Sequence, residues 1–284
     1  MGVVVQGHRR TKLDDHKVNT GCIHLINNCY RLDMTADERH RLMTEMLQHQ
    51  ERIEVDEFAA RCATSAATIR RDLDLLEQRG VLRRVHGAAV SLVLGGYEPG
   101  YAQRVLENRW SKAALAQKVD GLVQDREFVF LDSGSTATQI ASVLQQRLLT
   151  VFPASLHAVN ELIGGRSRII VPGGDLSEGE MAFQGPMAER NIAALRFDTA
   201  IITPCAFDLS TGIMAYDLAD AAIKRAAIAS AKRVIVVCDQ SKWERHAPAV
   251  VAGPDQVDQV VTDHEFSQPE IAAARAAHVE VTSL

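Results

Sequence analysis

The segment at residues 65–79 carries apolar residues on one helical face and polar residues on the other faces. The apolar positions recur at intervals of three and four and are Ile69, Leu73 and Leu76. Ser65 is suited to the helix N-cap, where its hydroxyl accepts a hydrogen bond from a free amide of the first turn. Gly80 is suited to the carboxyl end, where many helices need a left-handed residue. The pattern predicts one amphipathic helix with a defined start and end.

Shorter patterns flank this helix on both sides. The preceding residues predict another helix, separated from the first by only residues 63–64, and its apolar stripe is Val55, Phe58, Ala59 and Cys62. Residues 81–90 predict a short strand, a turn at Gly87 and a returning strand, with three exposed basic side chains, Arg83, Arg84 and His86. Together the segments predict a helix-turn-helix followed by a basic wing, an arrangement that binds DNA.

Two arginines stand in the first turns of the predicted helix. Basic residues there oppose the helix dipole, so Arg70 and Arg71 gain nothing for an isolated helix and suggest a polyanion in front of them. Solvated arginines on an ordinary amphipathic helix are the alternative, and the flanking segments favour DNA. The net charge of −5 gives no general attraction to nucleic acid. Between residues 61 and 86, however, six arginines face three acidic residues, which gives a local charge of about +3.

Beyond residue 111 the chain alternates between amphipathic helical segments and short β-branched runs. The pattern predicts helices at residues 112–123, 136–146, 156–163, 217–231 and 269–277. It predicts strands at residues 127–131, 148–152, 168–171, 199–202, 234–238 and 257–261. Continuous apolar strands between helices are typical of a mostly parallel sheet covered on both faces. The expected fold class is therefore an α/β domain preceded by a winged helix-turn-helix domain.

The start of the chain sets the expected domain limits. Residues 1–33 have little periodicity, whereas Thr35 before Asp37 and Glu38 predicts a capped helix that continues through Leu42, Met46 and Leu47. We therefore expect 1–33 to be a disordered extension or a misassigned start, with Met34 as the true initiator. The expected organisation is a winged helix-turn-helix at 34–90, a Gly/Pro-bearing linker at 91–110 and an effector-binding α/β domain at 111–284.

Chemically distinctive loops follow several predicted strands. Ligands of open parallel sheets bind at the carboxyl ends of strands. The loop Asp132-Ser133-Gly134-Ser135-Thr136 precedes a helix and could hold a phosphate, although it is not a P-loop and could equally be a helix cap. The glycine pair Gly173-Gly174 allows close backbone approach to a ligand or simply a turn. A further acceptor, hydroxyl and cations are supplied by Asp239, Ser241, Lys242 and Lys224, although a single lysine is more often solvated.

The N-terminal motif resembles the DeoR family of bacterial sugar-catabolism repressors. The residues that carry the resemblance are Thr64-Ser65-x-x-Thr68-Ile69-Arg70-Arg71-Asp72-Leu73 and Arg84-Val85-His86-Gly87-Ala88-Ala89. Thr64 and Ala88 depart from the usual family pattern. The downstream loops also match, as do Lys224-Arg225-Ala226 and Val257-Asp258-x-Val260-Val261-Thr262-Asp263. In the linker, Arg104, Asn108 and Lys112 match the family's residue types, and we interpret this region as transmitting state between domains. The resemblance spans residues 35 to 265.

This resemblance implies an effector domain similar in fold to ribose-5-phosphate isomerase, and a phosphorylated sugar or polyol as effector. It implies effector contacts from Asp132, Ser133, Gly134, Ser135, Thr136, Gly173, Gly174, Lys224, Asp239, Ser241 and Lys242. The expected DNA-binding residues are Ser65, Thr68, Arg70, Arg71, Arg83, Arg84 and His86. The chain has Pro153 and Ala154 where the family commonly has a polar Thr-Asn pair, so the effector's identity does not transfer from relatives.

Two classes of function fit these observations. The first is a DNA-binding repressor of a sugar or polyol operon, homo-oligomeric and controlled by the effector. The second is a sugar-phosphate isomerase or transferase with an accessory DNA module, for which Asp132, Asp208 and Asp239 are candidate bases. Neither a nucleophile–histidine constellation nor metal-ligand spacing is evident, so we expect no catalytic residue, no metal and no cofactor.

Composition excludes several other classes of protein. The five cysteines are odd in number and form no C-x-x-C, so neither a disulfide framework nor a zinc ribbon is indicated, and reduced thiols fit a cytoplasmic protein. No apolar run approaches the ~18 residues that a membrane-spanning helix needs. The motif and the family resemblance imply three partners: a duplex DNA operator, a small phosphorylated sugar or polyol, and further copies of this chain. Composition adds that no membrane partner is expected.

Overall fold

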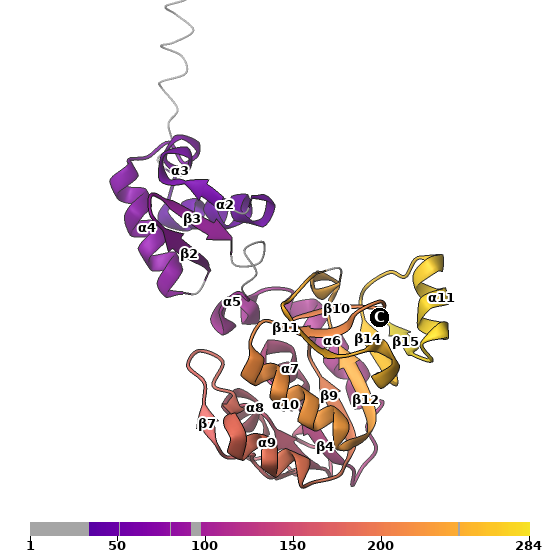
Figure 1. The fold of residues 1–284 in the computed structure, drawn as a ribbon. Helices are drawn as coiled ribbons and strands as arrows, with labels where there is room; N and C mark the ends of the chain where they lie inside the picture. Colours follow the sequence, from indigo (N-terminus) through magenta and orange to yellow (C-terminus); the bar gives the residue numbers. More distant parts are fainter. Residues whose placement is uncertain (1–33, 51, 80, 92–97, 244) are drawn as a thin grey trace, which may run out of the picture.

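The computed structural model describes residues 34–50, 52–79, 81–91, 98–243 and 245–284. These residues form a smaller N-terminal part and a larger α/β part (Figure 1). The connector, residues 98–100 among those described, leads into helix α5 (Tyr101–Leu106). The expectations for residues 1–33, for Gly80 and for the first half of the linker fall outside the described residues. No helix among the described residues is long and apolar enough to cross a membrane.

The N-terminal part is a winged helix-turn-helix. Its elements are α2 (Ala36–His49), β1 (Arg52–Glu54), α3 (Val55–Arg61), α4 (Ala66–Gln78), β2 (Leu82–Val85) and β3 (Ala88–Ser91). The three strands form an antiparallel sheet in the order β1-β3-β2. Helices and sheet share one apolar core that includes Met43, Ile53, Phe58, Ile69 and Leu73. The predicted helices and wing are confirmed, whereas the hydrophobic pattern did not predict β1.

The larger part is built on a seven-stranded, fully parallel sheet in the order β15-β14-β12-β9-β4-β5-β6. The strands are β4 (Phe128–Leu131), β5 (Thr150–Pro153), β6 (Arg168–Ile169), β9 (Phe197–Ile202), β12 (Ala231–Val237), β14 (Gln259–Thr262) and β15 (Glu280–Ser283). Along β12, Val234 and Val236 enter one apolar cluster while Ile235 and Val237 enter another. Alternate residues thus face opposite sides, and both faces of the sheet are buried.

Helices cover both faces of this sheet. On one face α6 (Arg109–Asp120), α7 (Ser135–Leu144) and α8 (Leu156–Leu162) share a core with the strands. On the other face α9 (Gly185–Ala193), α10 (Leu218–Ala229) and α11 (Gln268–Ala276) do so. The predicted α/β fold class is confirmed. The ends of the predicted elements differ from the observed ones by a few residues, and the pattern did not predict α9 or β15.

Short antiparallel strands complete the larger part. A three-stranded sheet consists of β10 (Ala206–Asp208), β11 (Gly212–Ala215) and β13 (Ala249–Ala252), and a hairpin of β7 (Asp175–Leu176) and β8 (Phe183–Gln184). Two short 3-10 helices, η1 (Gln240–Lys242) and η2 (Pro254–Gln256), precede β13 and β14. The β7–β8 hairpin, which the sequence pattern did not predict, projects beside α8 and α9 (Figure 1). It supplies one wall of the cavity described below.

Candidate functional site

Helix α4 begins as its sequence predicts. The Ser65 hydroxyl accepts a hydrogen bond from the backbone N–H of Thr68 at 3.1 Å, and the two hydroxyls lie 2.9 Å apart. Thr68 is therefore tied to the cap rather than free. This contact fixes the first turn of the helix, which directly precedes the two arginines.

Arg70 and Arg71 are both exposed. Among the described residues, neither guanidinium has a hydrogen-bond or ion-pair partner, and the first turn of α4 contains no acidic residue. The structure places both arginines in the second turn of α4, beyond the first turn in which a helix dipole acts strongly, and presents two charged donors to solvent. Such exposed donors are favourable for an incoming phosphate backbone.

Asp72, the acidic neighbour of these arginines, is turned toward the protein interior. Its carboxylate accepts from Arg39 Nε at 2.8 Å and from His40 Nε2 at 3.1 Å. Burial acts to raise the pKa of Asp72, but the hydrogen bonds from Arg39 and His40 outweigh burial and hold the pKa below its usual value. Asp72 therefore ties α4 to α2 and does not neutralise the exposed arginines.

The wing differs from expectation at one residue. Arg83 and His86 are exposed, as the pattern predicts, but Arg84 is half-buried. The Arg84 guanidinium forms an ion pair with Asp74 of α4, and its backbone N–H donates to Glu77 Oε1 at 2.8 Å. Arg84 holds the wing against α4, because two acidic side chains of that helix lie within its reach.

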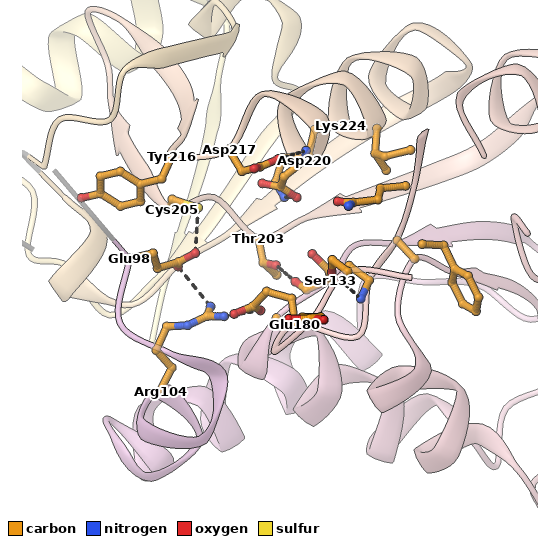
Figure 2. Close-up of a pocket in the computed structure, with 18 residues that line it drawn as sticks. Glu98, Arg104, Ser133, Glu180, Thr203, Cys205, Tyr216, Asp217, Asp220 and Lys224 are labelled. Atoms are coloured by element: carbon orange, nitrogen blue, oxygen red, sulfur yellow. Dashed lines mark hydrogen bonds and ion pairs between the residues drawn. The ribbon is translucent and has the colours of Figure 1, made fainter. Parts of the chain in front are cut away.

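A cavity of about 290 Å³ lies at the carboxyl ends of β4 and β9, between α5, α10 and the β7–β8 hairpin (Figure 2). Its lining is rich in charged side chains. The acidic ones are Glu98, Glu178, Glu180, Asp217 and Asp220, and the basic ones are Arg104 and Lys224. Both basic groups are already engaged by carboxylates, in two separate clusters.

The first cluster surrounds Lys224 of α10. Its Nζ lies 3.1 Å from the Asp132 carboxylate and 2.5 Å from Asp220 Oδ1. Asp132 is fully buried and also accepts the Thr203 backbone N–H at 2.9 Å. Burial raises the pKa of Asp132 to about 6, although the Lys224 charge opposes this rise. Burial acts to lower the pKa of Lys224, but Asp132 and Asp220 raise it, so the lysine stays charged.

The second cluster surrounds Arg104 of α5. Its guanidinium lies 3.0 Å from Glu98 Oε1 and forms a further ion pair with Glu180, while its Nε donates to the Pro99 carbonyl at 2.9 Å. Lys242 Nζ also reaches Glu98 Oε1 at 3.3 Å. Burial acts to raise the pKa of Glu98, but Arg104 and Lys242 lower it to about 2. This cluster joins the connector, η1 and the hairpin.

The carboxyl end of helix α5 is held in place. Lys112 of α6 is buried and donates to the carbonyl oxygens of Arg104 and, at 2.8 Å, of Glu107. Asn108 adopts the left-handed conformation that starts α6 and donates to Asp239 Oδ1 at 2.9 Å. The three linker residues singled out in the sequence therefore anchor this helix to the α/β part.

The predicted effector residues fall into three groups. Ser133, Gly134 and Lys224 line the cavity, and Asp132 lies directly behind Lys224. Ser135 and Thr136 are buried in the first turn of α7, outside the lining. The remaining residues lie away from the lining, although Lys242 reaches it through Glu98: Gly173, Gly174, Asp239, Ser241 and Lys242.

Several cavity residues were not among the predicted effector contacts. Glu98, Arg104, Glu180, Thr203 and Cys205 come from three separate regions of the chain and meet only in the folded protein. Cys205 donates to Glu98 Oε2 at 3.2 Å, and Thr203 Oγ1 donates to the Ser133 carbonyl at 2.6 Å. The one available signal was Arg104, which matched the family pattern in the linker. Among the described residues, no cluster of His, Cys, Asp and Glu could hold a metal ion.

Comparisons with known proteins fit this architecture. The DeoR-like helix-turn-helix domain matches residues 39–93, and the DeoR C-terminal sensor domain matches residues 107–264. The transcriptional repressor AccR of Agrobacterium fabrum is 34% identical over 232 residues, which cover 81% of this chain and 90% of AccR. The L-fucose operon activator of Haemophilus influenzae is 28% identical over 229 residues, which cover 80% of this chain and 92% of that protein.

A solved structure of ribose 5-phosphate isomerase A from Methanocaldococcus jannaschii aligns over 48% of this chain and 55% of its own, with 16% identity and a TM-score of 0.37. That likeness is too distant to bear on function. The two matching domains occur in the order that the winged helix-turn-helix and the cavity-bearing α/β part predict, and the sensor match alone spans more than half of the chain. The chain belongs to the DeoR family of DNA-binding transcriptional regulators.

Proposed function

We propose that this protein represses a sugar or polyol catabolic operon and is released from, or recruited to, its operator by a small phosphorylated sugar-like effector. Similarity to a transcriptional repressor and to an L-fucose operon activator supports a regulator of sugar metabolism. The observation that carries the DNA-binding half is the pair Arg70 and Arg71, exposed and unpaired among the described residues at the capped start of α4. Such donors match the bases and phosphates of a major groove.

The cavity supports the effector half of the proposal. A volume of about 290 Å³ fits a small metabolite, and its hydroxyl, amide and charged groups suit a polyhydroxylated ligand better than an apolar one. Gly134, which directly precedes α7, lines the cavity, and the start of a helix favours an anionic group. Effector binding changes DNA affinity only if the effector binds the two arrangements of the protein with different affinity.

The test is a DNA-binding measurement on matched arginine variants. A duplex is selected from a random-sequence library with the purified chain, and its affinity is measured by fluorescence anisotropy. Arg70→Ala and Arg71→Ala are each expected to weaken binding by ~1–3 kcal/mol, because each removes a groove contact. Arg79→Ala is the control, since Arg79 is exposed at the opposite end of the same helix. Wild-type affinity in the double variant would refute this function.

The enzyme alternative has one candidate base at the cavity, Asp132. Its carboxylate oxygens are occupied by Lys224 and by the Thr203 amide, and the side chain is fully buried. Asp208 and Asp239 accept hydrogen bonds from nearby amide groups and lie outside the cavity lining. A general base must reach its substrate's proton, so this geometry favours a structural role for all three. Turnover of ribose 5-phosphate by the purified chain would reverse this preference.

A further inference from the structure

An anionic effector meets an obstacle in the cavity. Both basic groups that line it are already neutralised, Arg104 by Glu98 and Glu180, and Lys224 by Asp132 and Asp220. The additional carboxylates of Asp217 and Glu178 leave the lining with an excess of negative charge. A phosphate group can bind here only if one of these carboxylates moves away, because like charges repel strongly in a partly buried site.

Three of the four paired carboxylates are held in place. Asp132 is fully buried with two donors, and Glu98 has further partners in Lys242 and the Cys205 thiol. Asp220 lies one turn before Lys224 on the same helix. Glu180 is the exception. Its side chain is 33% exposed, more than those of the other three, and among the described residues its carboxylate is bound by Arg104 alone.

Glu180 also stands in the β7–β8 hairpin, a loop from which its side chain can approach or leave Arg104. It stands in the loop between β7 and β8, two strands of two residues each, beside Gly179 and Met181, which both have positive φ. Backbone hydrogen bonds fix this loop next to Glu180, from Leu156 N–H to the Met181 carbonyl at 2.9 Å and from Ser177 N–H to the Ala182 carbonyl at 2.9 Å. The Glu180 side chain reaches from this loop to the Arg104 guanidinium at the cavity (Figure 2).

We propose that the Glu180 carboxylate is an internal substitute for the effector's anionic group and holds the position on Arg104 that a phosphate takes in the ligand-bound protein. This inference rests on the proposed function, because it requires the effector to carry an anionic phosphate. A guanidinium binds carboxylate and phosphate in the same planar, bidentate manner, so one group can replace the other. Arg104 becomes an effector-binding residue, and Glu180 determines specificity.

Because the ligand must displace a carboxylate from Arg104, the site discriminates between ligands by their charge. A phosphate ester carries a charge of about −1.5 to −2 near neutral pH, against −1 for the carboxylate that it displaces. A neutral sugar cannot compete for Arg104, whereas a phosphate ester can. The exchange also gives a new partner to a residue of α5, the helix that follows the connector to the DNA-binding domain.

The test measures binding of inorganic phosphate to the full-length protein by isothermal titration calorimetry, with ionic strength kept constant by chloride. In Glu180→Gln the competitor has lost its charge but keeps its shape, so phosphate affinity is expected to rise about tenfold over wild type. Glu178→Gln is the matched control, because Glu178 lines the same cavity from the same loop and is exposed. Its phosphate affinity is expected to stay within about twofold of wild type.

The proposal is overturned if phosphate binds Glu180→Gln no more tightly than wild type, or if neither protein binds it. Weaker binding would mean that Glu180 contacts the ligand instead of competing with it. Should Glu180→Gln fail to fold, Glu180→Asp serves the same purpose, since the shorter side chain withdraws the carboxylate from Arg104. It is expected to bind phosphate about threefold more tightly than wild type. DNA binding by the Arg70 and Arg71 variants is measured separately, so this inference and the proposed function can fail independently.

Discussion

Glu98 is the buried carboxylate on which the Arg104 cluster depends. It lies at the end of the connector and accepts hydrogen bonds from Arg104, Lys242 and the Cys205 thiol. The two positive charges overcome burial and lower its pKa to about 2 from an ordinary value of 4.5. The folded protein therefore excludes a proton that the unfolded chain binds as the pH falls below about 4.5.

The free energy of unfolding of the α/β domain should depend on pH because of this difference in proton binding. The contribution of Glu98 is fully present above its unfolded pKa and is lost as the pH falls toward 2, so wild-type stability should decrease through this range. Glu98→Gln removes the titrating carboxyl. The variant should lower the free energy of unfolding by roughly 3 kcal/mol near pH 7, and its plot of stability against pH should be flatter below about pH 5. Urea unfolding followed by tryptophan fluorescence measures this, because both tryptophans, Trp110 and Trp243, lie in the α/β domain.

The matched control for this experiment is Glu161→Gln. Glu161 is exposed on α8, and among the described residues it forms no ion pair. Its variant should follow the wild-type profile between about pH 5 and pH 3, because it removes no buried charge. Parallel profiles for Glu98→Gln and wild type would contradict the role given to Glu98.

For single residues, the sequence predicts those that act through neighbours in the chain and misses those that act through contacts made only in the folded protein. Ser65, Arg70 and Arg71 are recognisable because a cap and a helical start depend only on neighbouring residues. Glu98 stands six residues before Arg104, whereas Glu180 stands 76 residues after it. No spacing in the sequence reports that the three side chains meet. The effector cavity could therefore be located at the strand ends, but its charged partners could not be named.

Among the elements, the β7–β8 hairpin departs most from its sequence-based interpretation. The glycine pair that precedes it was expected to admit a ligand or to form a simple turn. A Cβ at Gly174 would lie 2.6 Å from the Gln184 carbonyl oxygen, whereas a Cβ at Gly173 would find its nearest neighbour, Met187 Sδ, at 3.9 Å. Gly174 thus allows β7 to approach β8 closely, and the hairpin needs this glycine irrespective of any ligand.

Two alanine variants should separate these roles. Both glycines have positive φ, +69° at Gly173 and +93° at Gly174, so each alanine carries a backbone strain of about 1 kcal/mol. Gly174→Ala also forces two backbone segments apart, and we expect it to lower the free energy of unfolding by about 3 kcal/mol or more. Gly173→Ala is the control. Urea unfolding of the α/β domain provides the comparison, and equal losses in the two variants would contradict the close-approach explanation.

The hydrophobic pattern predicted six of the seven strands of the parallel sheet, but neither β15 nor the short antiparallel strands. The second halves of β9 and β12 are continuous apolar runs, because both faces of the sheet are buried there, and that pattern is visible in the sequence. By contrast, β7 and β8 have two residues each, and β1 has three, too few for a period. β1 exists because the distant strand β3 pairs with it, and β7 and β8 exist because they pair with each other across a short loop. Helix α9, which the pattern did not predict, has one local signal, a proline in its first turn.

For the whole molecule, the distribution of charge limits how one chain can bind DNA. The net charge is −5, and residues 34–91 contain nine arginines but ten acidic residues. Positive charge is concentrated on α4 and the wing, and part of it is used internally, since Arg84 pairs with Asp74. Long-range attraction to DNA is therefore weak, and affinity must come from a few local contacts. A single winged module has too few such contacts for a long operator.

Two copies acting together would overcome this limit, so we predict a homo-oligomer that binds a two-fold symmetric operator. Light scattering should give a multiple of the 31.1 kDa chain mass at micromolar concentration. Near the concentration at which the oligomer dissociates, DNA binding should rise more steeply than first order in protein, because assembly and binding are linked. Arg79→Ala should leave both the mass and the steepness unchanged. A 31.1 kDa species that binds the selected duplex with first-order dependence and full affinity would show that one module suffices.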